Sequence, residues 1–157
     1  MAKTQRTDGL DQNPVLRITR TFAATPERVY RAFTNPGDLE KWFGPEGVNC
    51  IVHDIDPRPG GAYSFTMRNE NGEEHPLSGV FEEVVPNKKL VYTWTWATGT
   101  LEGVETRVTV DFADKDGGTE LTLTHELLPT DTAVEMHTIS WTGSFDCLAI
   151  ELKIQPD

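Results

Sequence analysis

Apolar side chains recur with a helical period over residues 132–154, the longest periodic stretch of the chain. At ~100° per residue, one face of this stretch carries a row of mostly large side chains. The row consists of Val134, His137, Trp141, Phe145, Leu148 and Leu152. Because such a face must be buried against an apolar partner, the pattern predicts a long helix that packs on the rest of the fold.

The start of this helix carries capping residues. Thr132 precedes Glu135 by three positions, which is the spacing of a capping box, and Asp131 is an alternative N-cap. Pro129 ends the preceding segment. We therefore expect the helix to begin within a residue or two of Thr132.

The opposite side of the same helix carries a second apolar stripe. It consists of Met136, Ile139, Gly143, Cys147, Ile150 and Ile154. A surface helix usually has one such stripe, so the second one needs a cover. Either another segment of the same chain lies over it, or the stripe forms the interface of a homodimer.

Upstream of the helix, the apolar period changes to two, as in half-buried strands. Turn sequences such as Asn71-Gly72 and Asp116-Gly117 separate successive runs, which is typical of antiparallel hairpins. The alternation predicts strands at 15–22, 48–55, 62–69, 74–85, 90–96, 106–112 and 119–127.

Two short helices are predicted between the first two strands. Thr25 and Pro26 form an N-cap and first-turn pair, and Asn35-Pro36 separates this helix from a second one that ends at Trp42. The order of elements indicates an α+β fold, in which a curved antiparallel sheet of about seven strands wraps over one long helix. Such an arrangement encloses a cavity between sheet and helix.

The inward positions of the strands and the long helix are the candidates for lining this cavity. They are Trp42, Phe65, Gly79, Phe81, Tyr92, Trp94, His125, His137, Trp141 and Phe145. At Gly79, we expect the missing side chain to leave room for a ligand. Each of the two histidines is either a proton carrier or a core residue that is hydrogen-bonded to a neighbour.

Composition and charge narrow the function. A chain of 157 residues is one domain of common size, with 1–14 expected as a flexible tail and 15–155 as the fold. The net charge of −11 opposes binding to nucleic acid or to an anionic membrane surface. The sequence lacks a membrane-length apolar run and the apolar core of a signal peptide, so we expect a cytoplasmic protein.

Metal and cofactor motifs do not emerge from the sequence. The four histidines have no ligand spacing, and Gly60-Gly61 is not a phosphate-binding loop. Cys50 and Cys147 are isolated and fit apolar patterns, so we expect free thiols. The sequence therefore predicts no metal and no cofactor.

Several stretches resemble one known family. They are TPERVY at 25–30, AFTNP at 32–36, WFGP at 42–45, DPRPGG at 56–61, GVFEEV at 79–84, LVYTW at 90–94, GTELTLTH at 118–125 and WTGSF at 141–145. The chain resembles the activator-of-heat-shock-protein-ATPase-homologue-like domains of the START-like superfamily, also called SRPBCC or birch-pollen-allergen-like. The resemblance covers about 15–152 and implies a helix-grip fold with a deep cavity.

This superfamily includes lipid carriers, cyclases, stress proteins and co-chaperones, so the resemblance implies a fold and not one function. Our leading hypothesis is non-catalytic binding of a small, largely apolar ligand, with a role in the stress response as one implication of the resemblance. One alternative is a cyclase, hydratase or hydrolase that uses His125 or His137 as general base. A second alternative is a module that contacts a chaperone.

Overall fold

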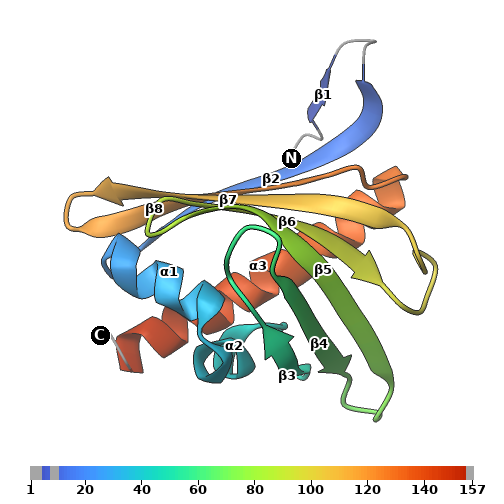
Figure 1. Cartoon of the computed structure of the whole chain (residues 1–157), viewed down its shortest axis with the longest axis horizontal. Coiled ribbons are helices and arrows are strands. Elements are labelled where there is room, and N and C mark those ends of the chain that lie inside the picture. Colours follow the sequence, from blue (N-terminus) through green and yellow to red (C-terminus); the bar gives the residue numbers. More distant parts are fainter. Residues whose placement is uncertain (1–4, 8–10, 155–157) are drawn as a thin grey trace.

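The computed structural model describes residues 5–7 and 11–154. Apart from the additional strand β1, its elements follow the predicted order, with two short helices early in the chain and one long helix after the strands (Figure 1). They are β1 (Gln5–Thr7), β2 (Asp11–Phe22), α1 (Pro26–Thr34), α2 (Pro36–Trp42), β3 (Asn49–Ile55), β4 (Ala62–Arg68), β5 (Glu74–Val85), β6 (Lys89–Trp96), β7 (Glu105–Lys115), β8 (Gly118–Glu126) and α3 (Asp131–Ile154).

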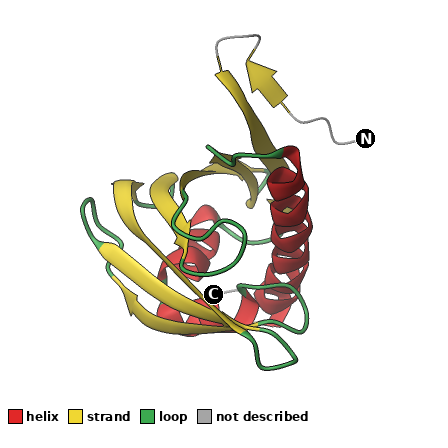
Figure 2. Cartoon of the chain, turned by 90° about the vertical axis from the view of Figure 1, so that its right-hand side faces the viewer, coloured by secondary structure: helices red, strands yellow, loops and turns green. Residues whose placement is uncertain are grey.

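The strands form one antiparallel sheet in the order β1-β2-β8-β7-β6-β5-β4-β3. The sheet curves around the core, and α3 lies along its open side (Figure 2). Irregular register between Val52 and Asp54, and between Phe81 and Glu83, bends the strands at that end of the sheet. This is the helix-grip fold, as the sequence predicted.

The inward face of α3 is buried as expected. Val134, Trp141, Phe145, Leu148 and Leu152 are all at most 6% exposed, and they meet core residues of the strands and of α1 and α2. The rings of Phe22 and Phe145 lie 5.9 Å apart in an edge-to-face arrangement. The terminal helix therefore closes the core that the curved sheet leaves open.

The N-cap of α3 differs from the sequence prediction. The Thr130 hydroxyl oxygen accepts a hydrogen bond from the Ala133 amide at 3.0 Å, and the Thr130 carbonyl accepts one from Val134 at 3.2 Å. Thr132 lies two residues further on, inside the first turn of α3, and both Thr132 and Glu135 are exposed. The expected capping box is therefore wrong, because the chain turns into the helix directly after Pro129.

The second stripe of α3 is covered only in its middle. A Cβ atom at Gly143 would lie 2.7 Å from the Cβ atom of Pro45, so Gly143 already packs against its own chain. Cys147 is half-buried against the core. The remaining members of the stripe have 59–67% of their surface exposed. They are Met136, Ile139, Ile150 and Ile154. The homodimer remains a prediction.

The N-terminal segment is longer in the sheet than alternation predicted. Part of the expected flexible tail at 1–14 lies outside the described residues. Where the structure describes it, β1 pairs with β2, and β2 begins at Asp11 and not at Val15. Residues 11–14 carry no apolar alternation, so backbone pairing alone defines this part of the strand.

Both cysteines are free thiols, as predicted. Burial raises the pKa of the Cys50 thiol to about 12, and the Glu40 carboxylate adds to this effect. Within 5–7 and 11–154, none of the helices combines the length and the apolar character that crossing a membrane requires.

Substitution of Thr130 tests its role as the N-cap of α3. We expect Thr130→Ala to lower the free energy of unfolding by about 1 kcal/mol, because the Ala133 amide loses its acceptor at the helix start. The matched change Thr132→Ala should alter it by less than about 0.5 kcal/mol, as for an exposed helical position. Urea denaturation of both variants measures the difference. A larger loss in Thr132→Ala would place the cap at Thr132 after all.

Candidate functional site

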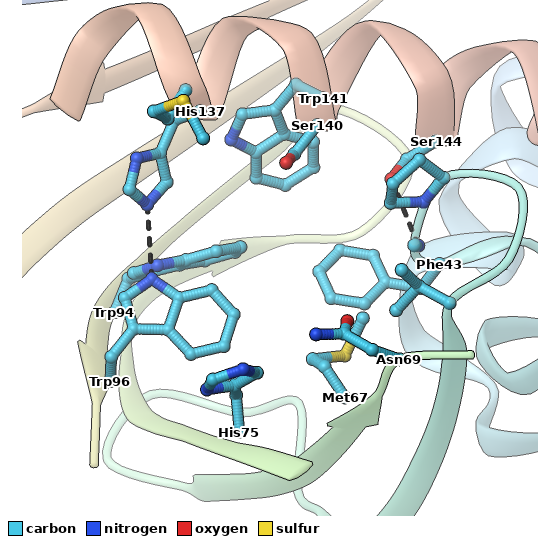
Figure 3. A pocket seen from close by; sticks show the side chains of 14 residues that line it. Phe43, Met67, Asn69, His75, Trp94, Trp96, His137, Ser140, Trp141 and Ser144 are labelled. Carbon is cyan, nitrogen blue, oxygen red and sulfur yellow. Dashed lines mark hydrogen bonds between the residues drawn. The ribbon is translucent and has the colours of Figure 1, made fainter. Parts of the chain in front are cut away.

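A cavity of about 200 Å³ lies between α3, the segment after α2 and strands β4, β5 and β6 (Figure 3). Its apolar lining includes Phe43, Pro45, Val48, Met67, Trp94, Trp96, Met136 and Trp141. Its polar lining includes Asn69, His75, His137, Ser140 and Ser144. The cavity is thus mostly apolar, with a few polar groups.

Helical spacing explains how α3 contributes to this cavity. His137, Ser140, Trp141 and Ser144 follow the i, i+3, i+4, i+7 pattern and so share one face. In Figure 3 their side chains project from the helix toward the strands. The Ser144 hydroxyl accepts a hydrogen bond from the Gly44 amide at 3.0 Å. This contact fixes the segment after α2 against the helix.

His125 lies outside the cavity, fully buried behind it. Trp141 Nε1 donates a hydrogen bond to His125 Nδ1 at 3.2 Å, so Nδ1 is unprotonated. His125 Nε2 therefore carries the proton and donates to the Thr106 hydroxyl at 2.8 Å. The Thr106 hydroxyl in turn donates to the Trp94 carbonyl at 2.9 Å. Both ring nitrogens are engaged in a chain that joins α3 to three strands.

His137 lies in the cavity wall, with its two nitrogens engaged in the same manner. Trp96 Nε1 donates to His137 Nε2 at 3.1 Å (Figure 3). The proton therefore sits on Nδ1, which donates to the Ala133 carbonyl at 2.7 Å. The rings of His137 and His125 are 5.1 Å apart. Two tryptophan–histidine pairs thus stand side by side.

Burial keeps both histidines neutral. It lowers the pKa of His125 well below its ordinary range, and the nearby His137 lowers it further. Burial also lowers the pKa of His137, while the hydrogen bond to the Ala133 carbonyl opposes this shift. His137 in the cavity wall and His125 behind it are therefore uncharged near neutral pH.

The indole nitrogen of Trp94 differs from those of the other three tryptophans. Trp42 Nε1 donates to the Ala32 carbonyl at 2.8 Å, and Trp96 and Trp141 donate to the histidines. Trp94 is 5% exposed, and its Nε1 has no hydrogen-bond partner among the described residues. A buried indole N–H normally finds an acceptor. The wall thus holds one unused donor.

The residues predicted from the sequence fall into three groups. Trp94, His137 and Trp141 line the cavity. Trp42, His125 and Phe145 are core residues with at most 1% exposure. The remaining side chains line a much smaller void of about 20 Å³ on the other side of Trp94 and Phe43, and they are Phe65, Phe81 and Tyr92.

Gly79 leaves no room for a ligand. A Cβ atom there would lie 2.0 Å from the carbonyl oxygen of Thr93 and 2.7 Å from the ring of Tyr63. The Tyr63 hydroxyl passes over this position and donates to the Thr93 carbonyl at 2.5 Å. The expectation that Gly79 makes space is therefore wrong, because the backbone of Thr93 and the Tyr63 ring occupy the position of a side chain.

Sequence reasoning missed several lining residues. Trp96 shares a strand face with Trp94, and Ser140 and Ser144 share a helix face with His137, so the periodicity already contained these three. The local sequence pattern gave no reason to place six further lining residues against α3. These residues are Phe43, Pro45, Val48, Met67, Asn69 and His75. In the part of the chain that the structure describes, no three histidine, cysteine or acidic side chains gather as a metal site.

Solved structures of related proteins share this architecture. A crystal structure of a protein from Chromobacterium violaceum matches with a TM-score of 0.83 at 34% identity, over 91% of this chain and 98% of that one. The AHSA1 protein from Silicibacter pomeroyi matches with a TM-score of 0.81 at 30% identity, over 90% and 99%. Fold and cavity together define a protein of the START-like class.

The chain belongs to the family described as "Activator of Hsp90 ATPase homolog 1-like protein", whose family model matches residues 23–153. The human "Activator of 90 kDa heat shock protein ATPase homolog 1" is 30% identical to it over 121 residues. That alignment covers 74% of this chain and 31% of the human protein, so the chain spans about a third of its relative's length. The family resemblance seen in the sequence motifs is confirmed.

The neutral histidines predict a pH dependence of stability. The unfolded chain binds protons at histidine below about pH 6.5, whereas the folded chain resists them because the pKa values of His125 and His137 are lowered. The free energy of unfolding should therefore fall as the pH drops from about 7.5 to about 5.5. Urea denaturation across this range measures the slope.

The variant His137→Gln should flatten this slope by at most about 1.4 kcal/mol per pH unit, the value for one proton. Glutamine retains an acceptor for Trp96 Nε1 but does not titrate. A slope that stays the same in this variant would show that His137 takes up a proton equally in both states.

Proposed function

We propose that this chain binds a small, largely apolar ligand in the cavity between α3 and strands β4–β6 and does not transform it. The volume of about 200 Å³ lies below the range of about 300–1,000 Å³ found for drug-sized ligands. It suits a small molecule, or one end of a larger molecule that extends through the mouth. Apolar surface gains free energy when it leaves water for such a lining.

The observation that carries the proposal is the apolar lining of the cavity. Tryptophan, phenylalanine and methionine side chains from α3, β4, β6 and the segment after α2 converge on one open space. A few polar groups, among them Asn69 and Ser140, interrupt this lining. A concave apolar surface with few polar groups is the usual form of a small-molecule site.

The state of the histidines supports binding over catalysis. A general base needs a nitrogen that can reach the substrate proton. At His125 and His137 one nitrogen already carries a proton, and the other accepts a tryptophan N–H. Both side chains therefore act as acceptors that hold tryptophan rings in place. An enzyme of cyclase, hydratase or hydrolase type has less support than a binding protein.

Contact with another protein is a second candidate function. The exposed members of the second stripe, Met136, Ile139, Ile150 and Ile154, place four large apolar side chains in water on one helix. A second copy of the chain or a chaperone could cover them. The human relative is named for activation of a heat shock protein ATPase, which makes a chaperone one partner to consider.

A blocking variant at the mouth tests the ligand site without changing the core. Ser140 is exposed, lies on α3 and lines the cavity, so Ser140→Phe should fill part of the opening. We expect it to weaken binding of the uncharged aromatic probe 2-naphthol by about tenfold or more in isothermal titration calorimetry, since its ring takes the probe's place.

Thr142→Phe is the matched control, because Thr142 is also exposed on α3 but does not line the cavity. Its affinity for 2-naphthol should equal that of the unaltered chain. Equal affinities for all three proteins would place the binding site elsewhere. The same loss in both variants would mean that the helix surface, and not the cavity, binds the probe.

A further inference from the structure

Aromatic rings surround the cavity on several sides. Trp94 lies 5.2 Å from Trp141 and 5.6 Å from Trp96, measured between ring centroids, with interplanar angles of 43° and 85°. Phe43 lies 5.7 Å from Trp141 at 72°. Figure 3 shows these rings as the floor and walls around the open space. The electron-rich faces of tryptophan attract cations more strongly than those of other aromatic residues.

The cavity lining contains no lysine or arginine among the described residues. His137 is neutral, with its proton held by the Ala133 carbonyl. An anionic ligand, such as a carboxylate, would meet neither of the two permanently charged cationic side chains there. Burial of an unpaired charge of that sign is strongly unfavourable.

Carboxylates stand at the mouth instead. The Glu73 carboxylate lies 3.4 Å from His75 Nε2 and 3.3 Å from Asn69 Nδ2, and both of these partners line the cavity. The Glu70 carboxyl carbon would lie 3.0 Å from a Cβ atom at Gly47, in the segment that forms the adjoining wall. The net charge of −11 adds a long-range attraction for cations.

We propose that the ligand of this cavity is an organic cation, an ammonium group with apolar substituents that rests against the tryptophan rings. This inference depends on the proposed binding function and adds the charge of the ligand to it. The aromatic rings supply cation–π attraction, and the carboxylates at the mouth supply the negative field.

Probes of one shape and different charge test this proposal. Choline, its uncharged carbon analogue 3,3-dimethylbutan-1-ol and the anion 3,3-dimethylbutanoate all carry three methyl groups on a quaternary centre. We expect choline to bind about tenfold more tightly than the alcohol, and the anion not to bind at all, as measured by tryptophan fluorescence titration.

Three results would overturn the proposal in distinguishable ways. Equal or tighter binding of 3,3-dimethylbutan-1-ol would disprove the charge preference and leave the apolar site intact. Tightest binding of the anion would reverse the sign of the assigned charge. Failure of all three probes together with 2-naphthol would remove the proposed binding function itself.

A charge-neutral variant at the mouth tests the carboxylates separately. Glu73→Gln should weaken choline binding severalfold and leave 3,3-dimethylbutan-1-ol unaffected, because only the cation feels the lost charge. Glu120→Gln removes the same charge on β8 outside the cavity lining and should change neither affinity. An unchanged ratio of the two affinities in Glu73→Gln would overturn the role of the mouth carboxylate.

Discussion

The buried hydrogen-bond chain from Trp141 through His125 and Thr106 to the Trp94 carbonyl is the constraint on which the rest of the structure depends. It joins α3 to β8, β7 and β6 through buried side chains. Loss of one partner would leave a buried polar group unsatisfied, at a cost of about 1–3 kcal/mol. The chain therefore fixes the position of the helix across the sheet, and with it the shape of the cavity.

The two tryptophan–histidine pairs also fix parts of the cavity wall before any ligand binds. Trp141 is held from behind by His125, and Trp96 is held at the side by His137, so both rings have defined orientations before a ligand arrives. Trp94 lies between them with a donor that has no partner within the described residues. Preorganised walls reduce the entropy that binding must overcome. The same histidines would have to break these bonds in order to act as bases.

The sequence predicted the fold in detail because burial on one face imposes a period on each element. The alternation placed most strand ends within one residue, and the helical period identified the buried face of α3. The cavity was less predictable, since the contacts of Pro45 with Gly143 and of Gly44 with Ser144 join positions about a hundred residues apart. The filled gap at Gly79 likewise depends on the Tyr63 ring, which no local pattern places there.

The four indole N–H groups provide the most direct measurement, because nuclear magnetic resonance resolves each of them and they occupy different surroundings. On titration with 2-naphthol, the signals of Trp94 and Trp96 should shift, whereas that of Trp42 should stay in place because its N–H is bonded to Ala32 away from the cavity. A shift of Trp42 with unchanged Trp94 and Trp96 would contradict a binding cavity at this site.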